Sequence, residues 1–170
     1  MAIELYHSDL PDGLNLGSSV AIDTETMGLN PNRDRLCLVQ LSSGDGNAHL
    51  VKFGPGEIDA PNLCRLLADP DVEILFHFGR FDIAVMRKFL GTTARAVYCT
   101  KIASKLVRTY TDRHGLKDLC RELIGVELCA ERLRFRPAVI GIGQIGARLL
   151  SPVHIWRKRN IAVRGVAIRN

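Results

Sequence analysis

An apolar run from Val20 to Ile22 leads directly into two carboxylates, Asp23 and Glu25, and this stretch constrains the chain more than any other. In a strand, residues two apart project from the same face, so the two acids are expected side by side at the strand end. Two like charges there are costly unless a cation lies between them, and hard oxygen ligands suit Mg²⁺ or Mn²⁺. The alternative is a strand end that faces solvent and carries two unrelated acids.

The elements around this stretch predict an α/β fold. A turn signal at residues 44–47 separates two mostly apolar runs, so the first strands are expected to form an antiparallel meander. Helical apolar spacing then alternates with further strands, which favours added parallel strands and hence a mixed sheet. The predicted strands are 3–6, 20–25, 36–41, 48–53, 72–77 and 96–99, and the predicted helices are 60–68, 80–90, 100–108 and 116–124.

The 170 residues suffice for one domain, but their charge is uneven. Residues 1–130 hold 14 Lys and Arg against 17 Asp and Glu, whereas residues 131–170 hold nine against one. A basic surface favours a nucleic-acid partner, and here that applies only to the tail. No run is long enough to span a bilayer and no secretion signal is evident, so we expect a cytoplasmic protein without membrane contact. Five cysteines without a C-x-x-C pair favour reduced thiols.

A second polar group follows the strand predicted at 72–77. Asp82 falls in the first turn of the next predicted helix, where the helix dipole by itself favours an acid. Ligands bind at strand ends in α/β sheets, so Asp82 could also approach Asp23 and Glu25. His77 is either a hydrogen-bonded core histidine or a catalytic one. The aromatic residues nearby, Phe81 among them, suit core packing better than base stacking.

Together these segments resemble the DEDD 3'-5' exonucleases. The motif D-x-E-T-x-G-L at residues 23–29 and the motif F-H-F-G-R-F-D at residues 76–82 match the first two exonuclease motifs. The strand L-C-L-V-Q-L-S at 36–42 is similar to the ribonuclease D branch, and residues 99–119 are similar to the small NrnC-type nanoribonucleases. The resemblance covers about residues 1–128 and implies a ribonuclease H-like mixed sheet with helices on both faces, truncated or altered at its C-terminal end.

The resemblance implies a metal-dependent 3'-5' exoribonuclease that acts on short single-stranded RNA and forms a homo-oligomer. In this family two divalent cations, Mg²⁺ or Mn²⁺, clamp the scissile phosphate. Asp23, Glu25 and Asp82 would be catalytic residues and three of the four acidic ligands. The implied substrate-binding residues are Thr26, Met27, Gly28, Leu29, His77, Phe81, Tyr110, Arg113 and His114. Of these, residues 26–29 would line the 3'-terminal nucleotide, while Arg113 could equally be a solvated loop charge.

The fourth acid of the family is missing. It lies in a helix reading approximately Y-A-A-x-D, but residues 130–170 contain neither Asp nor Tyr. We therefore divide the chain into an incomplete exonuclease domain, 1–128, and an atypical basic tail, 129–170, which should lack the C-terminal helices of the family. A shifted reading frame, an aberrant terminal exon or a sequencing error would explain the abrupt change. Translation of the other two frames from about codon 129 tests this hypothesis, which fails if neither encodes such a helix.

Three functions are compatible with these observations. The first is an exoribonuclease that cleaves RNA weakly or not at all, because a metal ligand and the tyrosine that positions water are absent. The second is a non-catalytic relative that binds nucleic acid with the same fold. The third is a structural domain whose acids are only helix caps and turn residues.

Overall fold

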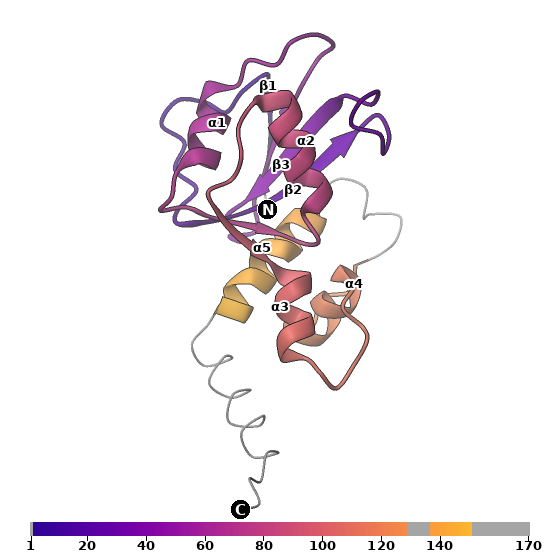
Figure 1. The fold of residues 1–170 in the computed structure, drawn as a ribbon. Coiled ribbons are helices and arrows are strands. Elements are labelled where there is room, and N and C mark those ends of the chain that lie inside the picture. Colours follow the sequence, from indigo (N-terminus) through magenta and orange to yellow (C-terminus); the bar gives the residue numbers. More distant parts are fainter. Residues whose placement is uncertain (1, 129–136, 151–170) are drawn as a thin grey trace, which may run out of the picture.

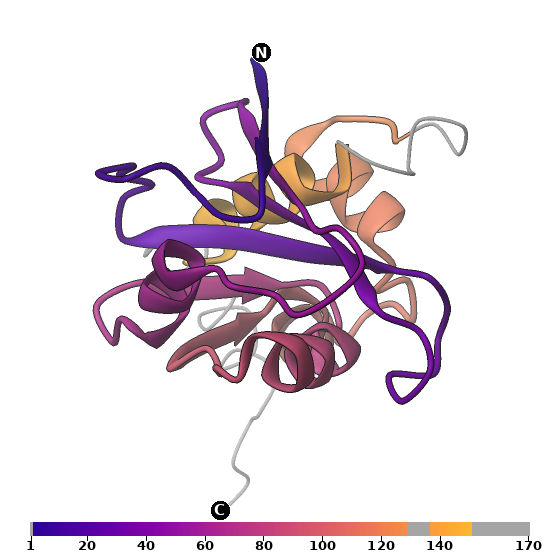
Figure 2. The ribbon, with the colours of Figure 1, turned by 90° about the horizontal axis from the view of Figure 1, so that it is seen from above.

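The computed structural model of the protein describes residues 2–128 and 137–150, which form a six-stranded sheet with helices on both faces (Figures 1 and 2). The strand order is β1-β4-β3-β2-β5-β6. The strands are β1 (Ile3–His7), β2 (Ser19–Thr26), β3 (Leu36–Ser42), β4 (Ala48–Lys52), β5 (Glu73–Phe76) and β6 (Ala96–Cys99). Helices α1 (Pro61–Ala68) and α2 (Arg80–Leu90) cover one face of the sheet. The remaining helices are α3 (Thr100–Val107), α4 (Leu116–Leu119), the π-helical turn η1 (Cys120–Ile124) and α5 (Pro137–Leu150).

The predicted mixed sheet is confirmed. Strands β2, β3 and β4 form the expected antiparallel meander. Strand β5 pairs in parallel with β2, and β6 pairs in parallel with β5. The sequence did not predict the position of β1, which pairs in parallel with β4 and closes the other edge. This order makes β2 a central strand, so its C-terminal end lies between β3 and β5.

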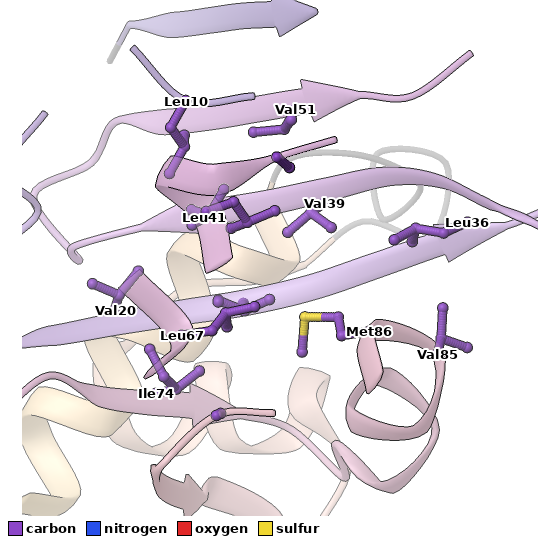
Figure 3. Packing of buried hydrophobic residues seen from close by; sticks show 14 of the residues in the cluster. Leu10, Val20, Leu36, Val39, Leu41, Val51, Leu67, Ile74, Val85 and Met86 are labelled. Carbon is purple, nitrogen blue, oxygen red and sulfur yellow. The ribbon is translucent and has the colours of Figure 1, made fainter. Parts of the chain in front are cut away.

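The larger core lies between the sheet and the helices α1 and α2 (Figure 3). Alternate residues of β2, such as Val20 and Ile22, point into it and meet Leu67 of α1 and Met86 of α2. Burial of each such side chain stabilises the fold by about 1.5–3 kcal/mol. This core fixes α2 against the sheet, and the N-terminal end of α2 carries Asp82.

The N-terminal end of α1 is capped by a residue far away in the sequence. Asp9 accepts the backbone N–H groups of Asn62 at 2.7 Å and of Leu63 at 2.9 Å. These groups have no partner within the helix, and the positive end of the helix dipole favours the carboxylate. The cap ties the segment after β1 to the helical layer.

Helix α5 covers the opposite face of the sheet, where Val139 and Ile142 pack with Ala21 and Leu75. Its glycines permit close contact, since a Cβ at Gly146 would lie 2.2 Å from Leu75 Cδ1. The expectation that residues 129–170 lack the C-terminal helices of the family is therefore wrong for 137–150, which form a helix packed on the sheet. Glycine disfavours helices, so local propensity did not reveal a helix that tertiary packing stabilises. Residues 129–136 and 151–170 of the predicted tail lie outside the described residues.

Two smaller predictions can also be compared with the described chain. The apolar stripe at 116–124 forms α4 followed by η1 rather than one regular α-helix. Within the described ranges, the cysteines at 37, 64, 99 and 120 are free thiols, and none of the helices is long and apolar enough to cross a bilayer.

Candidate active site

Strand β2 carries two of the predicted acids on the face that α5 covers. Ala21 packs against α5, and Asp23 and Glu25 lie two and four residues further along the same face. The pairing of β2 with β3 shifts in register between Glu25 and Thr26, which marks a bulge. A bulge at the end of a strand re-aims the side chains that follow, and here it separates the acids from the loop after β2.

A tight turn between β5 and α2 positions the third acid. Phe78 adopts a left-handed conformation, with φ of 67°, that is uncommon for a residue with a side chain. Gly79 follows it, and a Cβ at Gly79 would lie 2.4 Å from Phe76 Cβ. The turn therefore needs glycine at 79, and it starts α2 directly after the strand. Asp82 consequently lies in the first helical turn, near the end of β2.

Thr24 fastens Asp82 to β2. The Thr24 hydroxyl donates to Asp82 Oδ1 at 2.7 Å, and the Thr24 backbone N–H donates to the same oxygen at 3.1 Å. Thr24 lies between Asp23 and Glu25 in the sequence, so this bond brings α2 to the point where the two β2 acids lie.

The three acids influence one another electrostatically. Burial, followed by the negative charges of Asp82 and Glu25, raises the pKa of Asp23 to about 7. Burial also raises the pKa of Asp82, although its hydrogen bonds from Thr24 oppose the shift. Carboxylates that interact in this way are stabilised in their charged form by a nearby cation.

The donor set fits a divalent cation. Three carboxylates supply the oxygen ligands that Mg²⁺ and Mn²⁺ prefer, and Gln40 Oε1 is a further buried oxygen next to Asp23. In the part of the chain that is described, no three His, Cys, Asp or Glu side chains are already arranged as a complete metal site. Coordination by all three acids would therefore require at least one of these side chains to rotate.

The loop after β2 exposes two large apolar side chains beside the acids. Met27 is 69 % exposed and Leu29 is 86 % exposed. The loop is held from inside by the buried Asp34 carboxylate, which accepts the Asn30 backbone N–H at 3.0 Å. A Cβ at Gly28 would lie 2.3 Å from Asp34 Oδ2, so the loop passes too close to this carboxylate for any other residue.

A family model described as 3'-5' exonuclease matches residues 8–136. The chain belongs to the 3'-5' exonuclease family. The predicted ribonuclease H-like architecture is confirmed by NrnC of Brucella melitensis, which is 42 % identical, with 96 % of this chain and 87 % of that chain covered and a TM-score of 0.83.

Two further structures of the same Brucella protein, each with a bound ligand, also match this chain. The one bound to pGG is 42 % identical with a TM-score of 0.78, covering 97 % of this chain and 88 % of that chain. The one with bound Mg²⁺ is 39 % identical with a TM-score of 0.74, covering 100 % of this chain and 98 % of that chain.

Ribonuclease D of Gluconacetobacter diazotrophicus is 33 % identical over 109 residues, or 64 % of this chain and 27 % of that protein. The chain thus spans about a quarter of the length of the curated relatives it matches. The predicted kinship with the DEDD exonucleases, close to ribonuclease D and NrnC, is confirmed.

Two of the predicted substrate residues of this exonuclease chain, His77 and Phe81, make contacts within the fold near the end of β5. His77 Nδ1 hydrogen bonds with Thr100 Oγ1 at 2.9 Å, and burial, followed by the Lys101 charge, lowers its pKa to about 4. Phe81 packs partly buried against the larger core. Both positions therefore agree with the core alternatives left open by the sequence.

The other predicted substrate residues, Tyr110, Arg113 and His114, lie together after α3 around the fully buried Arg108. The Arg108 guanidinium pairs with Glu122 and donates to the Arg113 backbone carbonyl at 2.8 Å. It also donates to Ser104 Oγ at 2.9 Å, and Ser104 in turn hydrogen bonds with His114 Nδ1 at 2.9 Å. The Tyr110 hydroxyl donates to Glu122.

Sequence reasoning missed four residues that organise the site: Thr24, Asp34, Gln40 and Arg108. Only Gln40 carried a usable signal, since it is the one amide in β3 and lies between the apolar residues Val39 and Leu41. Thr24 and Arg108 act through partners at 82 and 122, and such pairings are decided by the tertiary fold.

Proposed function

We propose that the chain is a divalent-cation-dependent 3'-5' exoribonuclease that acts on short RNA. The observation that carries this proposal is that Asp82 is bound to Thr24 of the central strand and interacts electrostatically with Asp23, in a member of the 3'-5' exonuclease family. The Mg²⁺-bound structure of the 39 % identical Brucella relative supports the choice of cation.

The reaction is hydrolysis of the terminal phosphodiester. A bond forms between a water oxygen and phosphorus, the bond from phosphorus to the 3' oxygen of the preceding nucleotide breaks, and a nucleoside 5'-monophosphate leaves. Two divalent cations, when bound, would supply Lewis-acid activation of water and charge stabilisation of the leaving oxygen. The carboxylates of Asp23, Glu25 and Asp82 would hold the cations when these side chains are ionised. Thr24 would keep Asp82 oriented toward that position.

The surfaces beside the acids support a short RNA as substrate. Met27 and Leu29 offer exposed apolar contact for the 3'-terminal nucleotide, while Thr26 stabilises their loop by donating to the Gly28 carbonyl. We assign Tyr110, Arg113 and His114 to the remaining part of the substrate, with Arg108 holding that segment. The relative bound to pGG supports a substrate as short as a dinucleotide.

A second candidate is a non-catalytic RNA-binding protein. The observation that favours it is the composition of α5, which lies on the Asp23 face of the sheet and carries no acidic residue. Without a fourth acid we expect turnover to fall by several powers of ten, at about 1.4 kcal/mol of transition-state stabilisation for each factor of ten. Binding of RNA does not require this acid.

The test is release of mononucleotides from a short 5'-labelled RNA in Mn²⁺ or Mg²⁺. We expect slow release that stops with EDTA and in Asp23→Ala. Binding of the RNA without any release, even at high protein concentration, would favour the second candidate. Neither binding nor release would contradict both. Self-association and cytoplasmic localisation stay predictions, the first of which light scattering of the purified protein tests.

A further inference from the structure

Gln40 is a buried amide directly beside the first acid of the site. It lies on β3, where its backbone is paired with that of Asp23, so both side chains project from the same face of the sheet. Only 1 % of Gln40 is exposed. Its neighbours along β3 are the apolar residues Val39 and Leu41. A polar side chain at such a position needs hydrogen-bond partners for both ends of its amide.

Only one end of this amide has a partner. Nε2 donates to Asp23 Oδ2 at 3.4 Å, a long bond, whereas Oε1 is the single buried side-chain oxygen or nitrogen without a partner among the described residues. An unpaired buried acceptor is unfavourable unless another group supplies a donor. The amide also touches the carboxylate that burial and the charges of Asp82 and Glu25 already make difficult to ionise.

Ser42 offers a comparison on the same strand and the same face. It is fully buried like Gln40, but its hydroxyl donates to the Asn47 carbonyl at 2.6 Å and accepts the Gly44 N–H at 3.2 Å. Both bonds stabilise the hairpin between β3 and β4. Ser42 is thus satisfied by the protein alone, whereas Gln40 is satisfied only in part.

We propose that Gln40 is a positioning residue of the cation site. Its amide N–H orients the Asp23 carboxylate, and its amide oxygen accepts a hydrogen bond from the hydration shell of the bound cation. This inference rests on the proposed function, because it requires that the three acids hold a divalent cation. It explains why the buried part of β3 keeps an amide with one end unpaired. Groups that orient metal ligands commonly change metal affinity about 10- to 100-fold when removed.

The experiment compares Mn²⁺ affinity and metal-free stability in Gln40→Met, with Ser42→Ala as the matched control. Calorimetric titration gives the Kd for Mn²⁺, and urea unfolding in EDTA gives the stability. We expect Gln40→Met to bind Mn²⁺ at least roughly tenfold more weakly while its metal-free stability is equal or higher, since the unpaired oxygen is gone. Ser42→Ala should lose stability and keep the wild-type Kd.

The outcomes distinguish a failure of the role assigned to Gln40 from a failure of the proposed function. If wild type binds Mn²⁺ and Gln40→Met binds it equally well, the assignment of Gln40 is wrong and the cation site stands. If Gln40→Met loses stability in EDTA but keeps its Kd, Gln40 is structural, like Ser42. If the wild-type chain binds no Mn²⁺, the proposed function fails and the role of Gln40 fails with it. Gln40→Leu replaces Gln40→Met in the same comparison if the methionine variant does not fold.

Discussion

Asp82 Oδ1 lies 2.7 Å from Thr24 Oγ1, although 58 residues separate the two in the sequence. The same oxygen accepts the Thr24 backbone N–H. This contact joins α2 to the central strand next to Asp23, whose pKa the negative charge of Asp82 helps to raise. It also holds the conformation of a half-buried carboxylate before any cation binds.

Replacing Thr24 with valine removes the hydroxyl donor and keeps the shape. We expect the metal-free protein to lose about 1.5–3 kcal/mol of unfolding free energy at pH 8, the usual range for a hydrogen bond to a charged group. Thr24→Ser, which retains the hydroxyl, should lose less. Urea unfolding of the three proteins in EDTA measures the difference, and equal midpoints for wild type and Thr24→Val would show that the bond contributes nothing.

The raised pKa of Asp23 predicts a pH-dependent stability of the metal-free protein. Its folded-state pKa of about 7 lies above the value of about 3.9 expected in the unfolded chain. The contribution of Asp23 is therefore most favourable below pH 4 and is lost as the pH rises through 7. Asp23→Asn should be more stable than wild type at pH 8, and the gain should shrink toward pH 4. Thermal unfolding in EDTA across this range tests it, and a gain that is independent of pH would contradict it.

Gly28→Ala should disturb the loop that exposes Met27 and Leu29. The new Cβ would lie 2.3 Å from Asp34 Oδ2, and that carboxylate is held by Asn30 and Arg33. We expect short RNA to bind on the order of tenfold more weakly, or about 1.4 kcal/mol. Gly54→Ala is the control, because nothing lies within 4 Å of a Cβ there. Equal RNA affinity in both variants would remove this loop from the proposed substrate site.

Arg108→Met should destabilise the segment that follows α3. Arg108 is 0 % exposed, and its removal leaves the Arg113 carbonyl and Ser104 without their donor. We expect a loss of about 3 kcal/mol, the lower end for breaking a buried ion pair, because Glu122 can still be hydrated. Arg108→Lys should not restore it, since an ammonium lacks the planar fork.

The control for Arg108 is Arg121→Met. Arg121 pairs with Asp118 at 2.8 Å but is half exposed, so its loss should change stability by less than about 1 kcal/mol. Chemical unfolding of both variants gives the comparison. Similar losses for the two arginines would mean that burial of Arg108 adds nothing to its contribution.

Much of the architecture could be predicted because it depends on local sequence patterns, namely hydrophobic periodicity and turn residues. Val20 to Ile22 followed by alternating acids indicated a strand with one buried face, and the turn at 44–47 indicated the meander. The motifs around Asp23 and Asp82 indicated the family, which the comparison with exonucleases confirmed. Periodicity and motif order are properties of neighbouring residues, so the sequence suffices for them.

The sequence by itself determined the strands, the helices of residues 60–107 and the three acids. Tertiary structure alone decided that α5 covers the Asp23 face, that β1 pairs with β4, and that Thr24, Gln40 and Arg108 hold their distant partners. The physical reason is that these features depend on packing and hydrogen bonds between segments remote in the chain. Glycines such as Gly146 disfavour a helix locally but allow α5 to approach the sheet closely. The role of the buried Gln40 amide depends on the Asp23 carboxylate, which lies on the neighbouring strand.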